Sequence, residues 1–291
     1  MSKKLSKPML SFLWRPSEIN HSVVEVARKT STGAIFDVSE DLTDDTAKAF
    51  KAAGAKDIKI SADSFMNQAI EGFLQQSGAD TLWIEYHPAL LTDTPEAFLE
   101  RLHEMSATLR CIPISGDLDF LTLTLQSEWH PPAVALKGAE AAGFVGKETI
   151  GVLYSTLREI ANQGDRKPKM IIWGGVATPE AAAAFLCSGA EGIVFESLHW
   201  QTDRKIRERL SRLRPEHTSL VGRNLEVFCR LFDKGNSLAV KELKKEAGVL
   251  CKVDVTDQDR RTFTRKVKEA VIPALESDLG RQDLVFLSSE A

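Results

Sequence analysis

The feature that most constrains the fold of this chain is an eightfold alternation between short apolar runs and longer amphipathic stretches. Each run is rich in β-forming residues, ends at a turn, and precedes a segment whose apolar residues have roughly helical spacing. The runs cover residues 9–14, 34–38, 57–60, 81–86, 109–114, 133–136, 169–173 and 192–195. A helix that carries the chain back to the same edge makes successive strands parallel. Eight such units predict an α/β fold, a (β/α)8 TIM barrel, over residues 8–200.

An open, doubly wound parallel sheet is the rival architecture. Such a sheet usually has fewer strands and a glycine-rich turn directly after the first one. In this chain the paired glycines come late, after the sixth and seventh runs. Their position favours the barrel.

Capping residues mark the predicted helices between the runs. Thr94-Pro95 and Thr178-Pro179 each place a threonine N-cap before a proline at the first helical position. The predicted helices cover residues 17–29 with Ser17 as N-cap, 43–53 starting at an S/T/D cap at Thr43 and ending at Gly54, 64–76, 94–105, 148–162 and 178–187. Residues 117–127 alternate leucine and threonine, which is compatible with either a helix or a strand.

The chain changes character at about residue 201. Segments 203–214, 220–232, 237–247 and 257–275 all look helical, so residues 201–291 are predicted to form a helical C-terminal extension that packs on or beside the barrel. The segment 203–214 is strongly basic but has no interleaved aromatic residues, which favours a solvated helix face over a nucleic-acid site. Residues 285–291 have the composition of a linker start, which is typical of a domain cut from a longer chain.

Composition excludes several classes of function. The formal net charge is −4, which predicts neither a nucleic-acid nor an anionic-membrane partner. The apolar run at residues 8–14 is too short to span a membrane, and no signal-peptide cleavage pattern follows it, so we expect a cytoplasmic protein. The four cysteines are widely spaced without a CxxC pair, which indicates a reducing compartment and predicts no metal site.

Two late turns have the composition of a phosphate site. Gly174 and Gly175 follow the seventh run, and Ser197 follows the eighth. Paired glycines let backbone N–H groups approach an anion, and the helix predicted to begin near Pro179 adds its positive dipole end. Barrels commonly hold phosphate between the loops that follow strands 7 and 8. The alternative is that these glycines only make tight turns.

The loop after the sixth run adds a third motif. Lys137 would lie at the barrel mouth, and Gly143 lies among glycines that let the loop fold over a flat ligand. The stretch VALKGAEAAGFVG, followed by MIIWGGVATPEAAAAFLCSGAEGIVFES, resembles the nitronate monooxygenase (2-nitropropane dioxygenase-like) family of FMN barrels. That fold family includes FMN-dependent enoyl-acyl reductases. Within this family, the stretch that begins at Lys137 most resembles similar K-G-x-E-A-x-G stretches in the related domains of polyketide and polyunsaturated fatty-acid synthases.

The resemblance implies an FMN cofactor, NAD(P)H as reductant and an acyl-thioester substrate, with an acyl carrier protein or other synthase domains as partners. It assigns the FMN phosphate to a set of glycines and one serine: Gly143, Gly174, Gly175 and Ser197. It places Lys137 near the isoalloxazine ring, where a cation stabilises negative charge on the reduced flavin.

The chain also departs from the family pattern. Members that oxidise nitronates have a histidine base where this chain has Phe144, which cannot accept a proton. Ala142 replaces one glycine of the same loop, and the opening Gln-Ala-Pro-Met turn is replaced by residues 13–16. The usual Gly-Thr after the eighth run is Glu196-Ser197, and a carboxylate beside a phosphate is unfavourable unless it points away.

Other side chains fall at the predicted mouth. His87, two residues after Glu85, is the one histidine predicted there with an acidic residue close by and is a candidate for catalysis beside Lys137; the alternative is an ordinary loop histidine. Trp173 either stacks on a ligand or plugs the barrel. The remaining mouth candidates are Asp37, Tyr86, Ser115 and Asp117.

Two hypotheses of function remain open. The first is an FMN-binding oxidoreductase, closer to an enoyl reductase than to a nitronate oxidiser, in which the flavin passes hydride from NAD(P)H to an acyl thioester. The second is a degenerate barrel without redox chemistry that serves as a docking or structural domain of a synthase. The glycines, Lys137 and Ser197 favour the first, whereas Phe144, Trp14 and Glu196 favour the second.

Overall fold

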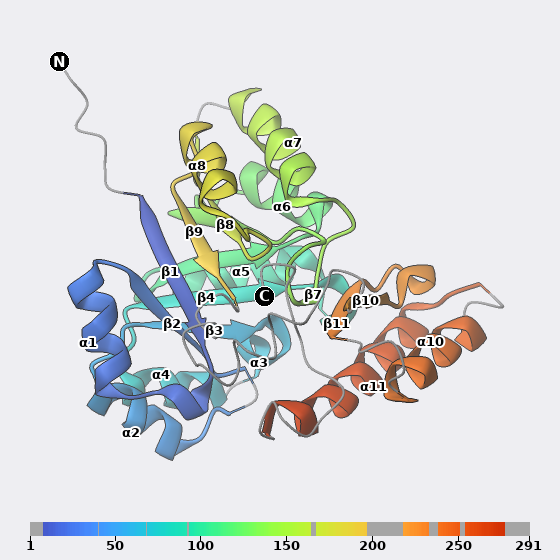
Figure 1. The fold of residues 1–291 in the computed structure, drawn as a ribbon, viewed down its shortest axis with the longest axis horizontal. Helices are drawn as coiled ribbons and strands as arrows, with labels where there is room; N and C mark the ends of the chain where they lie inside the picture. The colour runs from blue at the N-terminus through green and yellow to red at the C-terminus, as the bar shows by residue number, and fades with distance from the viewer. Residues whose placement is uncertain are drawn as a thin grey trace.

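The computed structural model describes residues 8–39, 41–67, 69–91, 93–163, 167–196, 218–232, 238–250 and 254–276. Eight parallel strands close into a barrel, each hydrogen-bonded to the next in chain order and the last to the first (Figure 1). The strands are β1 (Met9–Trp14), β2 (Gly33–Asp37), β3 (Asp57–Ser61), β4 (Thr81–Tyr86), β5 (Arg110–Ser115), β6 (Ala133–Leu136), β8 (Lys169–Trp173) and β9 (Gly192–Phe195). The predicted (β/α)8 fold is confirmed, and each predicted run coincides with or overlaps one strand.

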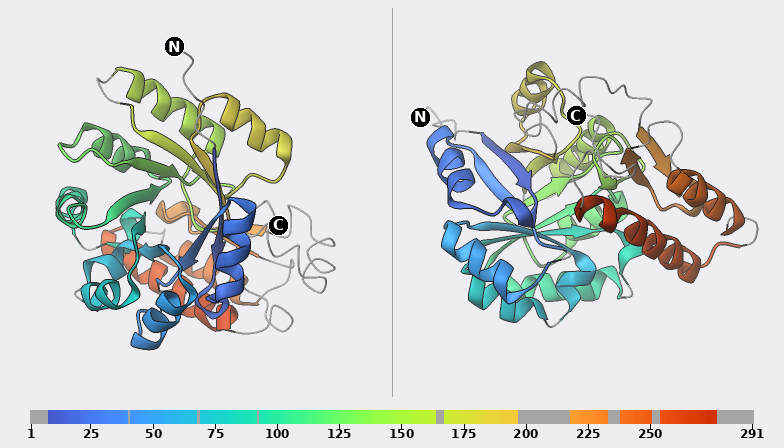
Figure 2. Two further views of the ribbon diagram at one scale, coloured as in Figure 1. Left: turned by 90° about the vertical axis from the view of Figure 1, so that its left-hand side faces the viewer. Right: turned by 60° about the horizontal axis from the view of Figure 1, so that its bottom comes forward.

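Helices lie around the outside of the barrel (Figure 2). They are η1 (Pro16–Glu18), α1 (His21–Thr30), α2 (Asp44–Ala53), α3 (Ala62–Met66), α4 (Ala69–Ser77), η2 (Pro88–Leu90), α5 (Pro95–Met105), α6 (Leu118–Gln126), α7 (Ile150–Gln163) and α8 (Pro179–Cys187). The predicted caps Thr43, Thr94 and Thr178 are confirmed, because each side chain accepts a backbone N–H of its helix.

Two predicted helix boundaries are wrong. Ser17 lies inside the short turn η1, and α1 is capped instead by Asn20, whose Oδ1 accepts the Val23 N–H at 2.9 Å. The predicted helix 64–76 is two helices, α3 and α4. The ambiguous segment 117–127 forms the helix α6, with Asp117 accepting the Phe120 N–H as its N-cap.

The barrel interior and its outer face form separate apolar clusters. Inside the barrel, Trp83 and Trp173 pack with ring centroids 5.5 Å apart, among aliphatic side chains of the surrounding strands. Trp173 is fully buried. Its burial against Trp83 agrees with the plug, one of the two roles considered for it. A larger cluster fills the layer between strands and helices.

The C-terminal extension contains strands as well as helices, which corrects the purely helical prediction. It comprises β10 (Thr218–Val221), η5 (Arg223–Leu225), β11 (Cys229–Phe232), α10 (Leu238–Leu250) and α11 (Asp257–Glu276). The prediction of a helix over 220–232 is wrong because its apolar residues alternate in sequence, which is the period of a strand. The predicted helices 237–247 and 257–275 are confirmed as α10 and α11, whereas 203–214 lies outside the described residues.

A short strand of the barrel domain joins the extension. The loop after β6, residues 137–149 and hereafter the β6 loop, contains β7 (Gly143–Phe144), which pairs antiparallel with β11. The resulting sheet has the order β10-β11-β7, and α10 and α11 lie beside it (Figure 1). Phe144 therefore belongs to a second hydrophobic core, together with Val227, Cys229 and Phe263.

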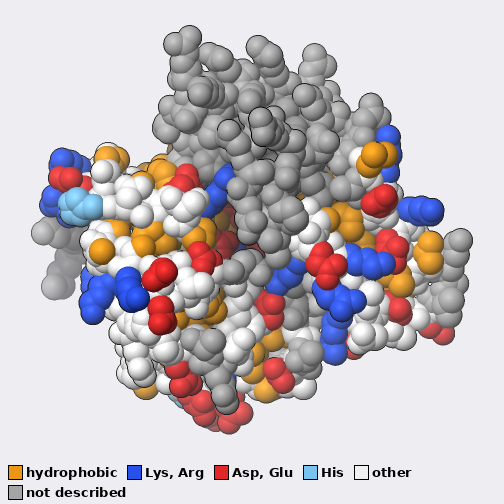
Figure 3. Space-filling view, turned by 90° about the horizontal axis from the view of Figure 1, so that it is seen from below, with side chains coloured by type: hydrophobic (Ala, Val, Ile, Leu, Met, Phe, Trp, Pro, Cys, Tyr) orange, Lys and Arg blue, Asp and Glu red, His pale blue; other side chains and the backbone are white. Residues whose placement is uncertain are grey.

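The surface carries charges of both signs. Among the described residues on the face in Figure 3, lysine and arginine side chains are interspersed with aspartate and glutamate. No helix in the described part of the chain combines the length and apolarity needed to cross a bilayer.

Candidate functional site

Charged side chains converge at the C-terminal ends of the barrel strands. Lys59 lies on β3, Glu85 on β4, Lys137 directly after β6 and Glu196 directly after β9. All four are buried, with 4–7 % of each residue exposed. Charges at this depth require partners, and each of these finds one of opposite sign.

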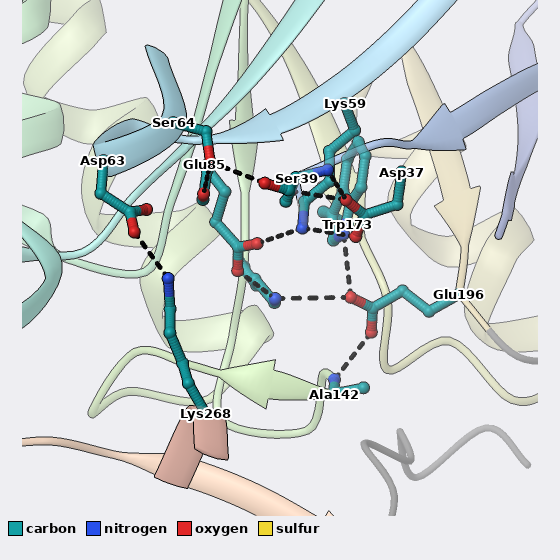
Figure 4. A network of polar contacts seen from close by, with 12 residues as sticks. Asp37, Ser39, Lys59, Asp63, Ser64, Glu85, Ala142, Trp173, Glu196 and Lys268 are labelled. Carbon is teal, nitrogen blue, oxygen red and sulfur yellow. Dashed lines mark hydrogen bonds and ion pairs between the residues drawn. The ribbon is translucent and has the colours of Figure 1, made fainter. Parts of the chain in front are cut away.

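The four side chains form a chain of ion pairs across the mouth (Figure 4). Lys59 Nζ lies 2.7 Å from Asp37 Oδ2 and 2.5 Å from Glu85 Oε2. Lys137 Nζ donates to Glu85 Oε1 and lies 3.6 Å from Glu196 Oε1. Negative and positive groups thus alternate from β2 round to β9, and Lys137 divides its charge between two carboxylates.

Burial and pairing shift the pKa values of this chain of ion pairs. Burial alone would raise the pKa of Glu85, but Lys137 and Lys59 together lower it to about 2. Burial would lower the pKa of Lys59, yet Asp37 and Glu85 raise it above its ordinary value. Both groups are therefore charged near neutral pH. Burial raises the pKa of Glu196, and the Lys137 charge opposes this only in part.

The predicted glycine turns form a cradle at the same edge. The cradle consists of Gly174 and Gly175 after β8 and the facing backbone of Ala141 and Ala142 in the β6 loop. Gly174 has φ +67° and Gly175 has φ +74°, a conformation that favours glycine. A Cβ on Gly175 would lie 2.8 Å from Glu140 Cβ, so the turn and the β6 loop pack closely. Gly143, with φ +72°, lies one residue further along.

The carboxylate of Glu196 occupies this cradle. The Ala142 N–H donates to Glu196 Oε2 at 2.7 Å, and the Trp173 indole donates to Oε1 at 2.9 Å (Figure 4). A Cβ on Gly174 would lie 2.3 Å from Glu196 Oε2. The Glu196 carboxylate therefore points into the cradle, although a phosphate could bind there only if this side chain pointed away.

His87 lies beside this cluster but away from its hydrogen bonds. Its Nδ1 accepts the Ala89 N–H at 3.2 Å, capping η2, and its ring lies 5.4 Å from the Phe144 ring. Burial, with the nearby Lys137 charge, lowers the pKa of His87 to about 4 against the opposing effect of Glu85. The imidazole is therefore neutral near pH 7.

Sequence reasoning located most of these groups but missed one. Lys137 and the three predicted glycines lie at the same mouth, and His87 lies at its side, whereas Ser197 is outside the described residues. Lys59 was missed, although a lysine between Ile58 and Ile60 in a predicted strand is itself a signal of a buried ion pair.

The described residues fit an oxyanion. Glycines at positive φ let the backbone approach, and the Ala142 N–H already holds a carboxylate oxygen, which stands in for such an anion. A phosphate can take this position only when the Glu196 side chain is displaced. Among the described residues, no group of three histidine, cysteine or acidic side chains is arranged to hold a metal.

Fold and site together define a (β/α)8 barrel with a glycine turn at its C-terminal mouth that packs against the chain's own Glu196 carboxylate. Two solved structures share this fold. FabK from Thermotoga maritima matches with a TM-score of 0.67 and 13% identity over 97% of this chain and 87% of the other. Nitroalkane oxidase from Streptomyces ansochromogenes matches with a TM-score of 0.59 and 11% identity over 96% and 89%. These matches agree with the fold that the resemblance implied. No family model and no curated protein sequence matches the chain.

Proposed function

We propose that this chain is an FMN-binding oxidoreductase domain of the enoyl-reductase type. The observation that carries the proposal is the glycine cradle with an anion already held in it, at the edge where (β/α)8 barrels bind phosphate. The shared fold with FabK and a nitroalkane oxidase supports the same class of chemistry. Bound FMN would supply hydride transfer from NAD(P)H to the double bond of an acyl thioester.

In this proposal the chain itself binds and orients the cofactor. Gly143, Gly174 and Gly175, together with Ser197, hold the phosphate through backbone and hydroxyl donors. Lys137 places a positive charge at the mouth, where Glu85 fixes the position of its ammonium group. We assign His87 a positioning role, since its neutral ring caps η2 beneath Phe144.

The substrate and partners follow from the same proposal. We propose an acyl thioester, delivered by an acyl carrier protein or a neighbouring synthase domain, as the hydride acceptor. We further propose that residues 8–200 and 201–291 are two domains that act as one unit. The pairing of β7 with β11, and the hydrogen bond from Arg230 Nε to the Ala139 carbonyl at 2.7 Å, support this.

The test is the colour and reactivity of the purified protein. We expect it to take up added FMN, to absorb near 450 nm (roughly the region of oxidised flavin), and to be bleached by NADH or NADPH without oxygen. Bleached protein should be reoxidised by an enoyl thioester but not by its saturated analogue. Protein that stays colourless in excess FMN would refute the proposal.

A second function is favoured by one specific arrangement. Phe144 lies in the core of the extension, directly against His87, and Trp173 plugs the barrel beneath Glu196. A mouth closed in this way suits a structural or docking domain without redox chemistry. The flavin experiment separates the two, because this alternative predicts no uptake of FMN.

A further inference from the structure

The Glu196 carboxylate is built into the cradle. It is 7 % exposed, and donors from two different segments point at its two oxygens: the Ala142 N–H from the β6 loop and the indole of Trp173 from β8. The bare backbone of Gly174 is what makes room for it. This is the arrangement of an anion in its binding site, with the anion supplied by the protein.

A ligand phosphate would compete with this carboxylate for the same donors. The Ala142 N–H can serve one oxyanion well, and two anions side by side in a buried site repel strongly. Lys137 cannot neutralise both, because Glu85 already shares its charge. A neutral hydroxyl, by contrast, can donate to the carboxylate where it lies.

We propose that Glu196 sets the ligand preference of the mouth: as an internal anion it competes with, and so weakens, the binding of phosphate groups, and it favours an uncharged ligand end with hydroxyl donors. This inference rests on the proposed function for the identity of the ligand as a flavin. The competition between Glu196 and a phosphate in the cradle does not depend on that identity. Riboflavin and FMN differ only in the terminal phosphate. They are therefore the matched pair of ligands for the test.

The experiment compares the wild type with Glu196→Ala and Glu191→Ala. The second variant is a control, because Glu191 is a carboxylate at the opposite end of β9, paired with Lys169. Fluorescence titration gives the Kd for FMN and for riboflavin, and calorimetry gives the Kd for inorganic phosphate. Circular dichroism confirms that each variant is folded, and Glu196→Gln serves as a near-isosteric second variant.

We expect Glu196→Ala to bind FMN and inorganic phosphate at least about tenfold more tightly than the wild type, from the loss of like-charge repulsion. Riboflavin affinity should not rise, and Glu191→Ala should behave as the wild type. Glu196→Gln should lie between, because it removes the charge but keeps the bulk.

The outcomes for this inference and for the proposed function are distinguishable. Equal FMN and phosphate affinities in the wild type and Glu196→Ala would overturn the role of Glu196, even if both proteins bind flavin. If no protein binds either flavin, the flavin function fails, and the phosphate titration alone decides the inference. A gain of phosphate binding in Glu196→Ala then supports it, and no gain overturns it.

Discussion

Phe144 and Cys229 lie opposite each other in the antiparallel pair β7–β11, so the β6 loop belongs to the barrel mouth and to the extension at once. Both side chains are buried in the second hydrophobic core. The position at which the sequence resemblance implied a histidine base is therefore an apolar packing position in this chain.

Replacing Phe144 by histidine should reduce stability without creating a base. The imidazole would lie in an apolar core without a partner, which costs about 1–3 kcal/mol in addition to the lost packing. Urea unfolding measures the loss, and Phe144→Leu, which keeps the site apolar, should lose less. A Phe144→His protein as stable as the wild type, or one that oxidises nitronates, would contradict the packing role.

Within the chain of ion pairs, Glu85 is predicted to be the residue whose substitution lowers the stability of the fold most. Glu85→Gln leaves Lys59 and Lys137 buried with reduced compensation, and breaking a buried pair in this way costs about 3–5 kcal/mol. The control is Asp80→Asn, which removes an exposed partner of Lys56 and should cost less than about 1 kcal/mol. Chemical denaturation at pH 7 tests both, and equal losses would contradict the account.

His87 should make the protein less stable in mild acid. Its folded-state pKa, about 4, lies below the ordinary value of 6.5, so the unfolded chain takes up the proton first as the pH falls. Stability is then lost between about pH 6.5 and 4, by up to about 3 kcal/mol. Above pH 6.5 this contribution is constant.

The matched variant is His87→Asn, whose side-chain oxygen can still accept the Ala89 N–H. We expect its free energy of unfolding to change less than that of the wild type between pH 7 and pH 4.5. Denaturant titrations at the two pH values give the difference. Parallel pH profiles for the two proteins would show that His87 is not held neutral by the fold.

Gly174 and Glu196 should be energetically coupled. Gly174→Ala strains the positive φ and drives a Cβ against Glu196 Oε2, whereas Gly54→Ala, at φ +73° with open space around it, meets only the backbone strain. The strain costs about 1–2 kcal/mol, and overpacking adds about 1–3 kcal/mol. In a Glu196→Ala background most of the added part should vanish, leaving the contact of the new Cβ with Ala141 Cβ at 3.0 Å. A double-mutant cycle with no coupling would place the carboxylate elsewhere.

The barrel could be predicted from the sequence because the patterns that specify its strands and helices lie within short stretches of the chain. Period-two and helical spacing, and threonine caps such as Thr43 and Thr178, are properties of neighbouring residues. The pairing of β11 with the nearby β10 is local, and the alternation of Cys229 and Leu231 could have indicated it. Its pairing with Phe144 of β7 joins segments far apart along the chain, which no local pattern reveals.

The groups at the barrel mouth could be predicted only in part. The order of strands places Lys137 and Gly174 at one edge, which follows from the topology alone. The direction in which Glu196 points depends on its rotamer and on donors from two separate segments, the β6 loop and β8, and no sequence pattern encodes it. Lys59 was overlooked because a charged residue within an apolar strand reveals its partner only after the barrel closes.

The most direct test of the central claim, that an oxyanion cradle is occupied by the chain's own carboxylate, is a crystal structure of Glu196→Ala grown with inorganic phosphate. A phosphate is predicted between Gly174 and the β6 loop, with an oxygen accepting the Ala142 N–H that Glu196 accepts in the wild type. A cradle that holds no phosphate in this variant, with the anion bound elsewhere or not at all, would contradict the account.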